Sequence, residues 1–331
     1  MVFKRFLVTT SVTALFLSAP TMAASAADMP AKAPRVTEQA QPVSGYVELY
    51  GGWARSTFDD TACSSGFCGT FSESANGWVL GGAGRVTYWW APNYSIQLDA
   101  QGEGTSYRLT PGNSFFQASS HAYLIGGHAN WRDPGRGLIG IFGGAGDTTT
   151  AFGISSIRHG LIGAEGQAYW GPLTLYGQAG YTSTFGSLAP DLDSVHAWFV
   201  RGTARVYINP NFRLEGTVFY ADGDLSFSGT APAGVTESFE TWLWRAKAEH
   251  KFAARPLSVF LAYEGSQSET NFELASAGFS STVKATDHRV TAGIRLYLGE
   301  NTLQWNDNHG TTLDIIAPLS VPARQFGMRT P

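Results

Sequence analysis

Charged side chains occupy alternate positions in several hydrophobic stretches of this chain, and the chemistry they offer is electrostatic. Arg85 and Asp99 lie on either side of one short turn, and Arg205 and Glu215 lie on either side of another. If each turn joins an antiparallel hairpin, the two members of each pair lie opposite each other on the same face. An arginine and a carboxylate placed in this way form an ion pair, or they set the electric field of a water-filled space.

These four residues belong to a larger set that shares one face. We expect the following charged side chains to line an enclosed interior: Arg85, Asp99, Glu103, Glu165, Arg201, Arg205, Arg213, Glu215, Arg245, Lys247, Glu249, Arg289 and Arg295. The cations gather in the later stretches, whereas Glu48 and the other early carboxylates lie in the first half, which predicts a basic wall and an acidic wall. Such a field would screen small polar solutes by charge. In a narrower interior, the same charges would pair across the space and fill it.

Hydrolysis is a second chemistry that the residue types allow. It requires a serine nucleophile, a histidine base within hydrogen-bond reach, and a group that orients the base. The candidates are Ser119 or Ser120 with His121, Ser194 with His196, and Asp287 beside His288. Adjacent residues of a strand point to opposite faces, so Ser120 with His121 and Asp287 with His288 are poor pairs. No candidate has the neighbours of a known motif, so we predict no catalytic site, no metal site and no cofactor.

The two cysteines lie close together in a polar stretch with the sequence CSSGFC. Outside the cytoplasm, Cys63 and Cys68 should form a disulfide bond. Closing so short a loop contributes about 2 kcal/mol in the chain-entropy description. We therefore expect the bond to shape a loop rather than to hold the fold together.

A stretch of alternating residues shows the element that would position the charges. In residues 77–104, apolar side chains occupy every second position on both sides of a short turn at Pro92. This period predicts two strands of an antiparallel hairpin, each long enough for a tilted transmembrane strand of about 9–11 residues. Trp89, Trp90 and Tyr94 flank the turn, as aromatic residues do where a bilayer meets water. The apolar face is therefore predicted to contact lipid.

The alternation continues from Gly45 to Leu298 and predicts twelve strands. Short turns contain Pro92, Pro134, Pro172, Pro210 and Pro256, and longer polar stretches cover residues 55–75, 108–116, 148–156, 185–193, 223–237 and 268–286. An open sheet edge in lipid would leave backbone groups unpaired, so the strands must close. We predict an all-β, transmembrane, antiparallel up-and-down barrel over residues 44–299, with short periplasmic turns and longer extracellular loops. A β-propeller also repeats at about 40–45 residues, but it needs four short strands per repeat.

The ends of the chain indicate export. Lys4 and Arg5 precede an apolar run, and Ala24-Ser25-Ala26 provides a cleavage site, so residues 1–26 are predicted to be a signal peptide. Residues 27–43 are predicted to form a periplasmic leader. With 43% hydrophobic residues, 15% charged residues and a net charge of -4, the chain is not expected to bind nucleic acid. We expect residues 300–331 to be an unstructured periplasmic tail, or to contain a short docking segment around residues 313–316.

Several of these stretches resemble porin-like outer-membrane β-barrel proteins of Gram-negative bacteria. The likeness lies in Ala-Ala-Asp-Met-Pro after the signal, in GWVLGGAGRVTYWWAPNYSIQLDA and WFVRGTARVYINPNFRLEGTVFY, and in the closing stretch HRVTAGIRLYLG. The resemblance covers residues 1–299 as a pattern and implies location and architecture more than activity. Such barrels commonly end on an aromatic residue of the last strand that the assembly machinery recognises, whereas this chain continues past Leu298.

The expected function combines this location with the charged interior. It is a narrow, porin-like channel for passive diffusion of small hydrophilic solutes across the bacterial outer membrane. The alternatives are a closed structural or surface-interaction protein without transport, and an outer-membrane phospholipase-type hydrolase. The expected partners are outer-membrane lipid and lipopolysaccharide, the barrel assembly machinery and small polar solutes, and a homo-oligomer is compatible with such a barrel.

Overall fold

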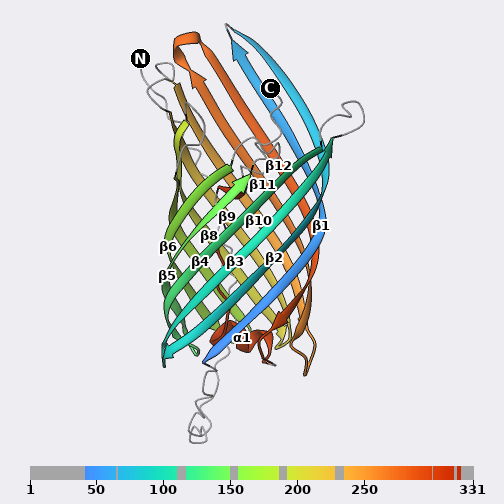
Figure 1. Ribbon diagram of the computed structural model, residues 1–331, viewed down its shortest axis with the longest axis vertical. Coiled ribbons are helices and arrows are strands. Elements are labelled where there is room, and N and C mark those ends of the chain that lie inside the picture. Colours follow the sequence, from blue (N-terminus) through green and yellow to red (C-terminus); the bar gives the residue numbers. More distant parts are fainter. Residues whose placement is uncertain are drawn as a thin grey trace, which may run out of the picture. The chain divides into compact units, whose positions relative to one another are not determined.

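Twelve antiparallel strands form a closed barrel in the computed structural model, with each strand paired to its neighbours in chain order and β1 paired to β12 (Figure 1). The structure describes residues 42–64, 66–109, 117–149, 156–185, 192–227, 235–299, 301–316 and 319–321. The strands are β1 (Val43–Ser64), β2 (Phe67–Ala91), β3 (Tyr94–Leu109), β4 (Gln117–Asp133), β5 (Gly137–Thr149), β6 (Ser156–Trp170), β7 (Leu173–Thr184), β8 (Leu192–Asn209), β9 (Phe212–Phe227), β10 (Val235–Lys251), β11 (Leu257–Leu274) and β12 (Phe279–Tyr297). The predicted all-β up-and-down barrel is confirmed, while the predicted signal peptide and residues 27–41 of the leader lie outside the described residues.

The two faces of each strand differ because side chains alternate along a pleated backbone. In β1, Val47 and Leu49 are 56% and 60% exposed, whereas the alternating residues Tyr46 and Glu48 are 5% and 8% exposed. The same alternation of exposed apolar and buried polar residues recurs around the barrel. An outward band of Leu, Ile, Val, Trp and Tyr is the surface that a transmembrane barrel presents to lipid.

The predicted hairpin registers are correct. Arg85 of β2 pairs with Asp99 of β3, and Arg205 of β8 pairs with Glu215 of β9. A slip of one residue would move every charged side chain to the lipid face, so the apolar pattern fixes the register. This register sets the height of each charge inside the barrel.

Two hairpins continue well beyond the lengths that the sequence pattern predicts. Residues 55–75 and 268–286, expected to be long loops, are mostly strand in the β1–β2 and β11–β12 hairpins, with a single turn of 3₁₀ helix, η1 (Ala275–Ala277), at the tip of the second. Inward apolar side chains continue in these extensions, where Phe58, Val283 and Ala285 form a buried cluster. The backbone ladder therefore propagates past the lipid-facing band.

The chain after β12 turns back into the barrel. Helix α1 (Leu303–His309) begins after Thr302, whose side chain accepts a hydrogen bond from the backbone N–H of Trp305. The Gln304 backbone N–H donates to the carbonyl oxygen of Pro210 at 3.1 Å, which places α1 at the barrel end that carries the short turns (Figure 1). In the part of the chain that the structure describes, no helix is long and apolar enough to cross a membrane.

We call residues 301–316 the C-terminal segment. Beyond α1 it runs along the inner wall, and Leu313, Ile315 and Ile316 are buried there. The prediction of an unstructured periplasmic tail is therefore wrong for these residues, and residues 313–316 are the docking segment of the alternative prediction. Polar composition favoured disorder, but the barrel supplies hydrogen-bond and apolar partners that a free tail lacks.

Candidate functional site: a charged lumen that holds the C-terminal segment

The lumen is lined by ion pairs between strands, and Glu249 of β10 is a centre of this network. Its side chain is fully buried and lies 2.9 Å from Arg295 and 2.8 Å from Arg213. Arg295 also contacts Glu48 of β1 at 2.6 Å, and Tyr297 donates a hydrogen bond to Glu249 at 2.8 Å. These contacts join β1, β9, β10 and β12 across the point where the barrel closes.

Further inward cations lie against carboxylates of the same strand, of an adjacent strand or of a more distant strand of the wall. The pairs are Arg205 with Glu215 at 2.9 Å, Arg245 with Glu264, Arg289 with Glu103 and Asp287, and Lys247 with Glu48 at 3.9 Å. The Lys247 ammonium also lies 3.9 Å from the ring centroid of Phe260, within the range of a cation–π contact. Every charged residue predicted to line the interior is found there.

On the opposite wall, a histidine lies between two carboxylates. The Nδ1 and Nε2 atoms of His128 lie 2.8 Å from Glu165 and 3.1 Å from Asp99, and Arg85 lies 3.5 Å from Asp99. The alternation of side chains predicts an inward position for His128, although His128 is not among the charged residues predicted to line the lumen. In the β3–β4 pair, His128 lies directly opposite Gln97 and diagonal to Asp99.

The predicted separation into a basic wall and an acidic wall is not found. Glu215 and Glu249 lie in strands that also carry arginines, and Glu264 lies in β11 beside Arg245 of β10. These carboxylates neutralise the arginines, and Arg85 lies among the early carboxylates. The physical reason is the cost of burying charge. An isolated charge in a narrow interior is expensive, and a hydrogen-bonded partner of opposite sign offsets that cost.

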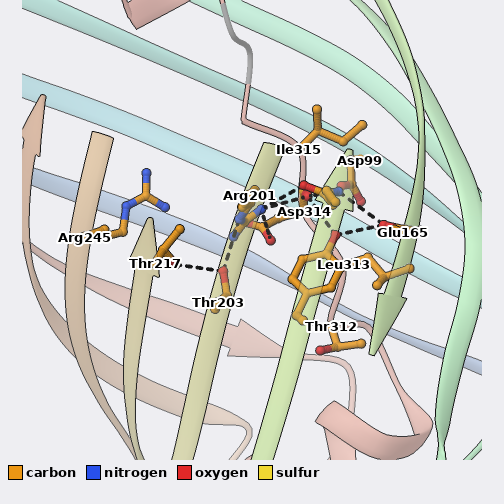
Figure 2. Close-up of polar contacts among 12 residues, drawn as sticks. Asp99, Glu165, Arg201, Thr203, Thr217, Arg245, Thr312, Leu313, Asp314 and Ile315 are labelled. Atoms are coloured by element: carbon orange, nitrogen blue, oxygen red, sulfur yellow. Dashed lines mark hydrogen bonds and ion pairs between the residues drawn. The ribbon is translucent and has the colours of Figure 1, made fainter. Parts of the chain in front are cut away.

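The C-terminal segment is held to the wall mainly through Asp314 (Figure 2). The two terminal nitrogens of Arg201 lie 2.9 Å from Asp314 Oδ1 and 3.1 Å from Asp314 Oδ2. Gln178 Nε2 donates to the backbone carbonyl of Asp314 at 3.0 Å. Asp314 is therefore bound by β8 through its carboxylate and by β7 through its backbone carbonyl.

Hydrogen bonds on either side of Asp314 hold the rest of the extended chain. Gln97 Nε2 donates to the carbonyl of Leu313 at 2.8 Å, and Gln101 Nε2 donates to the carbonyl of Ile315 at 2.9 Å. Nearer to α1, Arg205 donates to Asp307 Oδ1 and to Thr312 Oγ1, both at 2.7 Å. The segment is thus bonded to β3 on one side and to β8 on the other.

Apolar contacts complete the docking. Ile315, Ile316 and Val321 belong to a buried cluster with inward side chains of β4, β5, β6, β8, β9 and β10, namely Leu124, Phe142, Leu161, Phe199, Phe219, Ala221 and Leu243. Leu313 packs with Leu138 and Tyr176. Burial of each large aliphatic side chain stabilises the docked state by about 1.5–3 kcal/mol before entropy is considered.

Two carboxylates of the segment have altered proton affinities. Burial raises the pKa of the Asp314 carboxyl, but the Arg201 and Arg85 guanidiniums outweigh burial and hold this pKa well below its ordinary value. Burial likewise raises the pKa of Asp307, and the Arg205 and Arg213 guanidiniums outweigh it, so the Asp307 pKa is also lowered. Both side chains therefore carry a negative charge at neutral pH.

A cavity of about 160 Å³ remains beside the C-terminal segment. Its charged lining comes from Glu48, Arg85, Glu103, Arg205, Arg213, Glu215, Arg245, Lys247, Glu264, Arg289 and Arg295 of the strands and from Asp307 and Asp314 of the segment. A space with this lining accommodates water and small polar molecules. Part of the lumen is thus filled by chain and part is open.

The structure separates the members of one candidate catalytic pair, Asp287 and His288. Asp287 faces the lumen and accepts a hydrogen bond from Tyr107, whereas His288 lies on the other face with Tyr263. His196 stacks on Tyr181, with ring centroids 6.4 Å apart. Among the described residues, no group of three or more His, Cys, Asp or Glu side chains is arranged to hold a metal ion.

The predicted disulfide between Cys63 and Cys68 is present. The two cysteines are directly opposite each other in the β1–β2 ladder, close to the tip of that hairpin. The bond therefore fastens the end of a long strand extension, far from the charged lumen residues.

Comparisons with known proteins support the class that the fold defines. No protein-family model matches the chain, and no curated protein matches it either. Among solved structures, an outer membrane channel from Pseudomonas putida F1 matches with a TM-score of 0.51 at 12% identity, covering 81% of this chain and 100% of that chain. The outer membrane protease OmpT from Escherichia coli matches with a TM-score of 0.38 at 11% identity (80% and 99% covered), and a Pseudomonas aeruginosa FadL homologue with 0.40 at 10% (76% and 90%).

The protein is therefore an outer-membrane β-barrel of the bacterial type. The closed antiparallel ladder, the outward apolar band and the likeness of the whole barrel to the first of these structures agree on that class.

Proposed function

We propose that this barrel is a narrow channel for passive diffusion of small hydrophilic solutes across the outer membrane. The observation that carries the proposal is the inward face of β1, β2, β3 and β9–β12. There, charged side chains surround a polar cavity of about 160 Å³ instead of packing into a solid core. Fixed charges along such a space attract and orient small polar solutes.

In this proposal the C-terminal segment regulates the width of the passage. It is bonded to the wall through side chains and apolar packing, and it is not a member of the sheet. Its release leaves the barrel hydrogen bonds intact, because the ladder between β1 and β12 is independent of it. A passage that is narrow with the segment docked becomes wider when the segment leaves.

Single-channel recording on the refolded full-length protein in planar bilayers tests the proposal. We expect discrete current steps, and we expect larger or more frequent steps in the Asp314→Asn variant, in which the segment is held less firmly. Arg55→Gln, a substitution on the outer surface, should behave as the wild type does. If neither the wild type nor Asp314→Asn conducts, the channel function is refuted.

A closed structural barrel is the second candidate, and the same docked segment favours it. Apolar clusters fix Leu313, Ile315 and Ile316 to seven strands, β4 to β10, which resembles the way that small barrels fill their interior. This candidate predicts no current steps in any variant. It also predicts that loss of the Asp314 charge changes stability without changing permeability.

A further inference from the structure

Among the described strand arginines that form an ion pair in the lumen, Arg201 differs in the source of its anion. Arg205, Arg213, Arg245, Arg289 and Arg295 each lie within 4.0 Å of a carboxylate on a strand. In the described part of the chain, the carboxylate that pairs with Arg201 is Asp314 of the C-terminal segment. When the segment leaves, Arg201 becomes a buried cation whose nearest anionic partner has gone.

The wall half of this site is built without the segment. The Arg201 Nε–H donates a hydrogen bond to Thr203 Oγ1, with an N–O distance of 3.2 Å. The Thr203 hydroxyl is itself hydrogen-bonded to the Thr217 hydroxyl at 2.9 Å (Figure 2). The Arg201 guanidinium also lies over the Tyr176 ring, 5.1 Å from its centroid. These contacts orient the guanidinium so that its two terminal nitrogens face the site, which suits the two oxygens of a carboxylate.

We propose that Arg201 forms a carboxylate-binding site of the lumen that the Asp314 side chain occupies in the docked state, beside Gln178 and Tyr176, which donate hydrogen bonds to the Asp314 backbone carbonyl. Small monocarboxylate solutes then compete with Asp314 for Arg201 and release the C-terminal segment. This proposal rests on the channel function and names both the class of solute and the way in which it widens the passage.

The surroundings of the site favour a single negative charge. Glu165 lies close by and accepts hydrogen bonds from Tyr176 at 2.8 Å and from Gln178 at 3.2 Å. A dianion such as phosphate would bring a second negative charge towards Glu165, where Arg201 is the arginine in direct contact with the bound carboxylate and Arg85 acts from further away. A monocarboxylate places one charge on Arg201, as Asp314 does.

A solute can reach this position from the remaining cavity. The Asp314 side chain is 16% exposed and lines the cavity, while the Arg201 side chain behind it is 1% exposed. Asp314 therefore separates the open space from the guanidinium. A carboxylate in the cavity takes over the arginine as the Asp314 side chain moves away.

Hydrogen exchange of the backbone amides of residues 311–316 in the full-length protein tests the competition directly. The probe is sodium propionate, compared with propionamide, which has the same shape without the charge, and with sodium chloride at equal ionic strength. We expect propionate to accelerate exchange several-fold in the wild type and the two controls to leave it unchanged. Unchanged exchange with propionate in the wild type would overturn the proposal.

Variants separate the site from general effects of charge. Asp314→Asn should exchange about tenfold or more faster without propionate, which matches the loss of one charge-assisted hydrogen-bonded contact. Arg201→Gln should exchange equally fast and show no response to propionate. Arg55→Gln removes the same charge from the outer surface and should keep the wild-type response. A propionate response that persists in Arg201→Gln would refute the assignment of the site.

A second variant and a conductance measurement keep the proposal testable if Arg201→Gln does not fold or if the barrel does not conduct. If Arg201→Gln does not fold, Arg201→Lys keeps the charge without the planar fork and should show a weaker response to propionate than the wild type. Conductance recorded under the same conditions distinguishes this proposal from the channel function. Propionate-dependent exchange without any current retains the carboxylate site and refutes the channel. Current that is insensitive to propionate, with unchanged exchange, retains the channel and refutes the carboxylate site.

Discussion

Buried charge in this barrel is best tolerated where one group has several partners. Glu249 is the clearest case, since it accepts hydrogen bonds from Arg213, Arg295, Ser258 and Tyr297 while its side chain is fully buried. Such a network is stable as a complete set. Removing one member leaves the others desolvated and without a counter-charge.

The substitution Glu249→Gln keeps the shape of the side chain and removes its charge. We expect it to lower the free energy of unfolding by about 3 kcal/mol, because Arg213 and Arg295 lose a common anion in a buried site. Urea unfolding of the barrel in lipid vesicles measures the change. Glu240→Gln, the same substitution at an exposed position of β10, should alter stability by less than about 0.5 kcal/mol. Equal effects at the two positions would contradict the role of the network.

Docking of the C-terminal segment should weaken in acid. The pKa of Asp314 is lowered from its ordinary value of 3.8 in the docked state, so docking binds the charged form more strongly than the protonated form. The stabilisation of docking by the ionised Asp314 carboxylate is complete above about pH 5. It is lost as the pH falls below 3.8 towards the lowered pKa of the docked state. Tryptophan fluorescence of Trp305 in α1, followed from pH 7 to pH 3, measures release. Asp314→Asn should reduce this pH dependence. An unchanged titration in this variant would contradict the role of Asp314 as the group that controls docking.

Individual positions of the lumen were largely predictable from the sequence. The alternation of side chains placed Arg85 opposite Asp99 and Arg205 opposite Glu215, and the structure has both pairs in register. Contacts between distant strands were not predictable in this way. His128 bridges Asp99 and Glu165 of strands on either side of it, and that contact depends on the curvature of the closed wall, which residue spacing does not encode.

Among the elements, the C-terminal segment accounts for features of the strands that otherwise look anomalous. Strand β5 is apolar on both faces, so the alternation of side chains alone does not distinguish its inner face. Its inward Leu138 and Phe142 pack with Leu313 and with the cluster that holds Ile315 and Ile316. An apolar inner face in a barrel strand was therefore the sequence signal for an internal partner, and the tail contains that partner.

Close packing between β4 and the segment provides a test at this scale. A methyl group added at Gly126 would overlap the Cδ1 atom of Ile315, whereas one added at Gly127 would make ordinary contacts of 3.5 Å. We expect Gly126→Ala to destabilise docking by about 1–2 kcal/mol, because the displaced Ile315 is part of a packed cluster. Limited proteolysis of the C-terminal segment measures the effect. Gly127→Ala is the control, and equal cleavage of both variants would contradict the packing argument.

Considered as a whole, the molecule is a ladder closed by β1 and β12 around a nearly balanced set of charges. The number of strands and the outward band followed from the sequence pattern, because alternation and turn residues act locally. The path of the C-terminal segment could not be predicted from that local pattern. Its partners come from β3, β4 and β8 at once, and no local pattern specifies a contact that exists only in the closed barrel.

Ion selectivity is a property of the whole lumen and tests the channel proposal. Arg245 faces the cavity and pairs with Glu264, so Arg245→Glu places two carboxylates side by side on the wall. We expect the reversal potential in a salt gradient to shift towards that of the cation, since the local field changes sign. Arg55→Glu, on the outer surface, should leave the reversal potential unchanged. An identical reversal potential in Arg245→Glu and the wild type would show that ions do not pass this wall.

The position of the C-terminal segment also dictates an order of maturation. The surface that receives residues 313–316 is assembled from β3 to β10, strands that come face to face only in the curved wall. Residues 313–316 therefore dock after these strands have come together. In the channel proposal, a freshly inserted molecule is more permeable before this segment docks than after it.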